Sequence, residues 1–163
     1  MKFSVSIKSD AGDTYYVYLA PLDAGIEYDL NLRSYSDVEV YQIVLDRETG
    51  TNTTDIHVLN DISDFIAKVF LGNDNLILYY YCDDIQEIPS SNHVILPQEY
   101  RNRLFSTMIS RYLQQHDSLD IVDTPISIID AVGNAQYIHF ISRLDHLPVV
   151  DDIVRFVVEH YGK

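Results

Sequence analysis

The chain has 163 residues, 47% of them apolar, and its 25 acidic against 11 basic side chains give a net charge of −14. This length and apolar content predict one globular domain over residues 1–163 and exclude a disordered tail. The negative surface disfavours nucleic acid and anionic membranes as partners, and it favours a basic protein.

Apolar residues alternate with polar ones through the first part of the chain, which is the two-residue period of half-buried strands. The predicted strands cover residues 3–8, 14–20, 25–32 and 38–45. Turn residues at 10–13 and a break at 21–24 separate the first three. Because the links are short, we expect an antiparallel meander.

The period then changes to that of a helix, with apolar residues at positions 62, 65, 66, 69 and 70. Asn60 or Asp61 is expected to cap the start of this helix, and Gly72 to end it. A continuous apolar, Tyr-rich run over residues 76–82 follows. Such a run predicts a central strand that is covered on both faces.

Pro97 is a good first helical residue, and a second helix is predicted from Pro97 to His116. Short strands are predicted at 119–122, 126–131 and 135–141, with a hairpin turn at 132–134, and Pro148 opens a last helix. The predicted fold class is therefore α+β. A single antiparallel sheet would combine the N-terminal meander, the central Tyr-rich strand and a C-terminal hairpin, with about three helices packed on it.

The cellular compartment is predicted from the absence of a signal peptide and of a membrane-spanning segment in the sequence. The first eight residues alternate in polarity and lack the apolar core of a signal peptide, and no apolar run approaches membrane-spanning length. Cys82 is the single cysteine, so no disulfide within the chain and no Cys-based zinc site is expected. We therefore expect a cytoplasmic protein.

Arg101 breaks the pattern of the second helix because it falls on the apolar face, in a first turn where a cation opposes the helix dipole. Asp83 and Asp84, at the end of the preceding strand, are the nearest acidic partners in sequence. The alternative is that Arg101 extends out to solvent at the helix end. Candidate binding residues are Asp83, Asp84, Arg101 and Arg103.

Two further groups of residues could act as a nucleophile or as metal ligands, but each also has a simpler structural interpretation. Adjacent carboxylates would raise the pKa of a thiol at Cys82, so a small core residue is favoured over a nucleophile. A second group contains two histidines and three aspartates that could bind Zn²⁺ or Mn²⁺: His139, Asp145, His146, Asp151 and Asp152. Asp151 and Asp152 also suit a helix start, and the spacing matches no metal motif.

The strand that ends in Cys82-Asp83 and the helix that opens with Arg101, Arg103 and Phe105 resemble a small uncharacterised family of bacterial proteins, found mainly in Bacteroides-like bacteria. The resemblance is clearest from about residue 62 to 112 and extends to the order of elements elsewhere. The chain departs from the family at Met108 and Ile109, where the family has an aromatic pair, and in a longer loop after the strand. The resemblance implies no activity.

The favoured function is a non-catalytic, acidic protein-interaction module with no cofactor and no bound metal. Its sharper form is an inhibitor, immunity protein or antitoxin that masks a basic site. The alternative is a small hydrolase or metal-dependent enzyme that uses Asp83, Asp84 and Arg101, or a cluster of His139, His146 and Asp152. A third class is a homodimer built on an exposed strand edge.

Overall fold

The computed structural model describes residues 3–22, 38–49, 56–82, 97–116, 120–129, 132–133 and 135–161. The strands are β1 (Phe3–Lys8), β2 (Thr14–Pro21), β3 (Glu39–Thr49), β4 (Leu76–Cys82), β5 (Ile121–Ile129) and β6 (Ala135–Arg143). The helices are α2 (Ile56–Leu71), α3 (Pro97–His116), the short 3-10 helix η2 (Leu144–His146) and α4 (Leu147–Tyr161). None of these helices has the length and apolar content needed to cross a bilayer.

The α+β class is confirmed, but the expectation of a purely antiparallel sheet is wrong. The six strands lie in the order β1-β2-β3-β4-β6-β5, and β3 pairs with β4 in parallel. The physical reason is the helix α2 between them. Its 16 residues cover about 24 Å, which returns the chain to the end of the sheet where β3 began. All other neighbouring strands are antiparallel, including the β1–β2 and β5–β6 hairpins.

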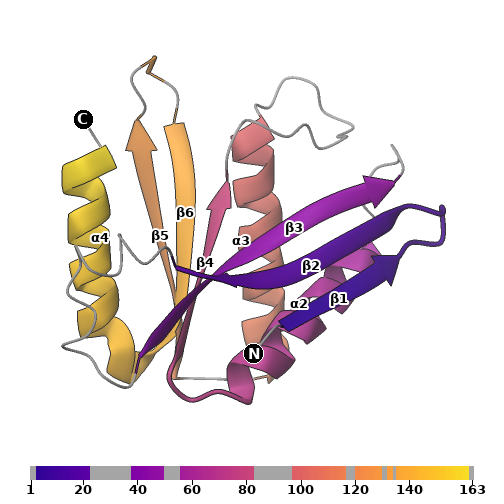
Figure 1. Ribbon diagram of the computed structural model, residues 1–163, viewed down its shortest axis with the longest axis horizontal. Helices are drawn as coiled ribbons and strands as arrows, with labels where there is room; N and C mark the ends of the chain where they lie inside the picture. The colour runs from indigo at the N-terminus through magenta and orange to yellow at the C-terminus, as the bar shows by residue number, and fades with distance from the viewer. Residues whose placement is uncertain are drawn as a thin grey trace.

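The sheet separates two layers of helix (Figure 1). Helices α2 and α3 cover one face with a core that includes Val17, Ile66 and Phe105, while α4 covers the other face with a core that includes Phe140 and Val150. Strand β4 lies between the two cores, and Leu76, Ile77 and Leu78 are buried. The apolar run therefore predicted a doubly covered central strand correctly.

Element boundaries differ from expectation in two places. Helix α2 begins at Ile56, so Asn60 and Asp61 lie exposed inside the helix and do not cap it. The residues at 119–122 and 126–131 that were predicted as separate strands belong largely to one strand, β5, which runs through Pro125. Proline is tolerated there because β5 is an outer strand of the sheet. The strand predicted at 25–32 lies outside the described residues.

Arg143, the last residue of β6, fixes the end of α2 against the sheet. Its guanidinium donates from Nη2 to the carbonyl of Phe70 and from Nη1 to the carbonyl of Asn73, both at 2.9 Å. The guanidinium also lies 4.5 Å from the centre of the Phe70 ring. It thus adds a second, charged donor to two carbonyl groups that also accept the backbone N–H groups of Asn73 and Leu76.

We expect Arg143→Met to lower the free energy of unfolding by about 1.5–3 kcal/mol, because it removes two hydrogen bonds donated by a charged group. Urea denaturation measures the change. Arg155→Met is the control, because Arg155 is exposed and pairs with Asp152 at 3.8 Å, so it should cost less than about 0.5 kcal/mol. Equal effects of the two variants would contradict the role of Arg143.

Candidate functional site

The structure leaves the predicted Asp–Arg pair untested. Asp83 and Asp84 lie outside the described residues. Arg101 and Arg103 lie in the first turns of α3, but their side chains are outside the described set, as is the side chain of Cys82 at the end of β4. The pairing of Arg101 with Asp83 or Asp84 therefore stays a prediction.

The proposed cluster of His139, His146 and Asp152 is not brought together, and neither are the nearby acids. Within the described part of the chain, no group of three or more His, Cys, Asp or Glu side chains is arranged to hold a metal ion. His139 lies in β6, whereas His146 follows in η2 and Asp152 pairs with Arg155 on α4. Closeness in sequence was misleading because β6 ends at Arg143 and the chain then turns into η2 and α4.

The structure instead gives His139 two different neighbours. Its Nδ1 lies 3.0 Å from Oδ1 and 3.2 Å from Oδ2 of Asp123 on β5. Its Nε2 lies 3.5 Å from the hydroxyl oxygen of Ser106 on α3. With the proton of a neutral imidazole on Nδ1, the ring donates to Asp123, and Nε2 can accept from the Ser106 hydroxyl. These three residues are called the polar relay below.

Strand register explains why two members of the polar relay meet. Pro125 pairs directly with His139, and Asp123 pairs with Ile141, so Asp123 and His139 are diagonal neighbours on adjacent strands. Side chains two residues apart share one face of a strand, and diagonal neighbours are within reach of long side chains. Ile141 belongs to the core under α2 and α3, so the relay lies on that face.

Aromatic rings enclose the relay on one side. The Phe105 ring lies 5.1 Å from the His139 ring, and the Tyr80 ring stacks on Phe105 at 4.4 Å with an angle of 11° between planes. His139 is 1% exposed, whereas Asp123 is 20% exposed. The imidazole therefore has little contact with water, and hydrogen bonds in such surroundings are stronger than in solvent.

A second feature of the structure is a split in the sheet between β3 and β4. Strands β3 and β4 pair only from Glu39–Leu76 to Gln42–Tyr79, although β3 continues to Thr49 and β4 to Cys82. At the last pair the Tyr79 hydroxyl donates to Oε1 of Gln42 at 3.5 Å. Burial raises the pKa of Tyr79, which keeps this hydroxyl a donor at neutral pH. Beyond that pair the two strands run in different directions (Figure 1).

An apolar hollow of about 330 Å³ lies against the split and is called the split hollow. Ile43 and Leu45 line it from β3, and Tyr80 lines it from β4, which are the parts of both strands beyond their pairing. Phe105 and Met108 of α3 close it, together with three apolar residues of α2. The split therefore opens beside the aromatic wall of the polar relay.

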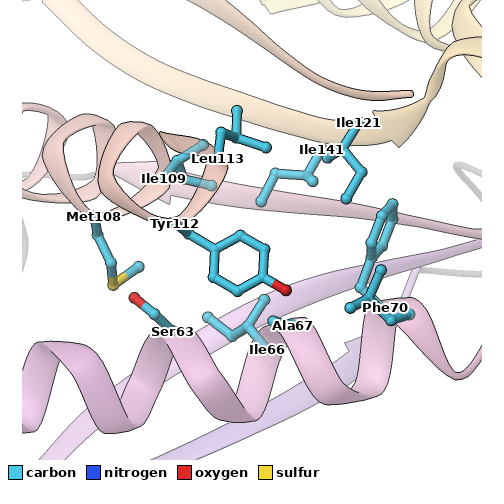
Figure 2. A pocket seen from close by; sticks show the side chains of 11 residues that line it. Ser63, Ile66, Ala67, Phe70, Met108, Ile109, Tyr112, Leu113, Ile121 and Ile141 are labelled. Carbon is cyan, nitrogen blue, oxygen red and sulfur yellow. The ribbon is translucent and has the colours of Figure 1, made fainter. Parts of the chain in front are cut away.

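A larger apolar hollow of about 450 Å³ lies between α2, α3 and the ends of β5 and β6, and is called the interhelix hollow. Figure 2 shows Tyr112 extending from α3 across it toward α2. Burial, and secondarily the carboxylate of Asp64, raises the pKa of Tyr112, so its hydroxyl stays protonated at neutral pH. Ser63 lines the same hollow, but its hydroxyl donates to the carbonyl of Leu59 at 2.9 Å.

Comparisons of the chain with protein-family models, with curated proteins and with solved structures find no match. The resemblance around Cys82 and Arg101 therefore stays a prediction.

Sequence reasoning singled out His139 but assigned it to the wrong partners, and it missed Ser106 and Asp123. One signal was present. In β5, Asp123 follows Ile121 at the two-residue spacing that places both on the same, inward face of the strand. An acidic residue on an inward face needs a hydrogen-bond partner, and a histidine on a neighbouring strand supplies one.

We expect Asp123→Ala to lower the free energy of unfolding by about 1–3 kcal/mol, because it leaves the buried Nδ1–H of His139 without its acceptor. Urea denaturation checks this. Asp145→Ala removes an exposed carboxylate from η2 and serves as the control, with an expected change below about 0.5 kcal/mol. If Asp123→Ala lowers the free energy of unfolding no more than Asp145→Ala does, the 3.0 Å contact between Asp123 and His139 does not stabilise the fold.

Proposed function

We propose that this protein is an acidic protein-interaction module that binds an extended segment of a basic partner in the split between β3 and β4. The observation that carries the proposal is the early end of the parallel pairing. It stops at Gln42 and Tyr79, while β3 continues for seven residues and β4 for three.

Beyond Gln42 and Tyr79, the main-chain groups of β3 and β4 no longer pair with each other. Backbone N–H and C=O groups need hydrogen-bond partners wherever water is excluded. An extended segment inserted between the strands would pair with these groups, which is strand addition as used by several peptide-binding domains. The affinity would then come from the main chain, independently of the partner's sequence.

Side-chain selectivity would come from the split hollow. Leu45 and Tyr80 face it from opposite strands, and the remaining lining is apolar. Every second side chain of an inserted segment would point into the hollow, so apolar residues at alternate positions are expected in the ligand.

The partner is expected to be basic because the chain carries a net charge of −14. A charge of this size accelerates encounter with cations and disfavours acidic competitors, and salt weakens both effects. In its sharper form the proposal makes the protein an inhibitor, immunity protein or antitoxin whose partner has a basic working surface. The alternative is a homodimer that forms through β1 or β5, the two outer strands of the described sheet. Measuring the oligomeric state in solution tests this alternative.

Linear peptides selected from a random display library against the full chain, then titrated by fluorescence anisotropy, test the proposal. We expect selected sequences to combine Lys or Arg with alternating apolar residues, and to bind less tightly at high salt. Leu45→Trp should weaken binding at least about tenfold, because the larger ring fills the split hollow.

Val44→Trp is the matched control, because it makes the same replacement at the adjacent position of β3, on the opposite face. An equal loss of peptide affinity in both variants, or no loss in either, would contradict binding in the split.

A further inference from the structure

We infer that Ser106 is a nucleophile for acyl transfer, activated by His139 and Asp123, and that the interhelix hollow receives the apolar acyl chain of an ester or thioester substrate. The inference is independent of partner binding in the split. It rests on the geometry of the polar relay and on where the interhelix hollow lies relative to it.

The order of the three side chains is that of an activated nucleophile. An activated serine needs a base within hydrogen-bond reach and a third group that orients the base. Asp123 holds the Nδ1 side of the ring at 3.0 Å, which leaves Nε2 directed at the Ser106 hydroxyl at 3.5 Å. The longer second distance is typical of catalytic hydrogen bonds without substrate, which tighten when the substrate binds.

Each member of the polar relay has a close neighbour that lines the interhelix hollow. Ile121 lies two residues before Asp123 on β5, and Ile141 lies two residues after His139 on β6. Because side chains two apart share a face of a strand, both lie beside the relay. On α3, Ile109 follows Ser106 by three residues and also lines the hollow.

The lining of the hollow indicates which part of a substrate it would receive. Figure 2 shows Ile121 and Ile141 at the strand side of the hollow and Ile109 at the side of α3. Eight of the eleven lining residues are aliphatic, Met or Phe side chains, and the remaining three are Ser63, Ala67 and Tyr112. This apolar lining suits an apolar chain, and the lining residues offer no cation for a charged one.

The proposed acyl transfer takes two steps. The Ser106 oxygen attacks the carbonyl carbon while Nε2 of His139 accepts the hydroxyl proton, and the bond to the leaving alcohol or thiol breaks as that group takes the proton from His139. Water then attacks the serine ester, gives its proton to Nε2, and releases a carboxylic acid as the proton returns to the Ser106 oxygen. Asp123 keeps the imidazole oriented throughout.

Ser106 lies in the middle of α3, so its own backbone N–H bonds within the helix and does not stabilise the oxyanion. Loss of one such donor slows acyl transfer by about 10²–10³-fold in enzymes that use it. We therefore expect fast formation of an adduct with a reactive probe but slow turnover of ordinary esters, with the serine ester accumulating.

The test uses the full chain incubated with an alkyl fluorophosphonate, followed by intact mass measurement and peptide mapping. We expect one adduct per chain at Ser106, none in Ser106→Ala, and labelling slowed at least about tenfold in Asp123→Asn. Ser110→Ala is the matched control, because Ser110 is an exposed serine of the same helix that belongs to neither the relay nor the hollow, and labelling of this variant should equal that of the parent chain.

A second measurement follows the release of p-nitrophenol from esters of increasing acyl length. We expect the burst rate to rise with chain length, and Ala67→Trp, which fills the interhelix hollow, to remove that rise while fluorophosphonate labelling of Ser106 persists. No adduct at Ser106 in the folded chain, or equal labelling of Ser110, would overturn the inference.

Discussion

Four residue pairs between β3 and β4, from Glu39–Leu76 to Gln42–Tyr79, join the two halves of the described sheet. On one side lie β1, β2 and β3, and on the other lie β4, β6 and β5. The pairing is parallel because α2 carries the chain back before β4 begins. Leu76, Ile77 and Leu78 are buried at this joint, so apolar packing on both faces supports a pairing with few hydrogen bonds.

The shortness of this joint accounts for the hollow beside it. Once the strands diverge beyond Gln42 and Tyr79, side chains of α2 and α3 have to fill a widening wedge, and they fill it incompletely. Ile66 and Met108 line both the split hollow and the interhelix hollow. The two spaces are therefore neighbours under the same pair of helices, with α3 forming a wall of each.

Helix α3 also brings the proposed binding and chemical features together. Phe105 closes the split hollow, and the next residue, Ser106, faces His139. Adjacent side chains on a helix point about 100° apart around its axis. One turn of α3 can therefore place Phe105 in the split hollow and Ser106 in the polar relay. The stack of Tyr80 on Phe105 separates the split from the relay and keeps the imidazole away from water.

Local patterns in the sequence predicted the elements but not their pairing. The continuous run ending at Cys82 identified β4 as the doubly covered strand, and Pro97 marked the first residue of α3. The positive φ of Gly133 agrees with the predicted hairpin turn between β5 and β6. The parallel joint was missed because strand alternation is the same in parallel and antiparallel pairs, although a helix between two strands indicated a crossover.

The candidate site was harder to predict because it depends on long-range register. Ser106, Asp123 and His139 are separated by 17 and 16 residues, and no local motif links them. Only the alignment of β5 with β6, and the packing of α3 across them, places the carboxylate and the hydroxyl on opposite sides of the imidazole. The spacing of His139 and His146 was more visible in the sequence, yet it corresponds to no shared site.

Amide hydrogen exchange of the free chain, resolved by NMR along β3, tests most directly whether the sheet is split. The amides of Tyr41 and Gln42 should both exchange slowly, because β3 is paired on both sides there. From Ile43 to Thr49, slow and fast amides should alternate, because only those directed at β2 have a strand partner in an open split. Uniformly slow exchange along the whole of β3 would show that the side facing β4 is already filled, and would contradict a binding site there.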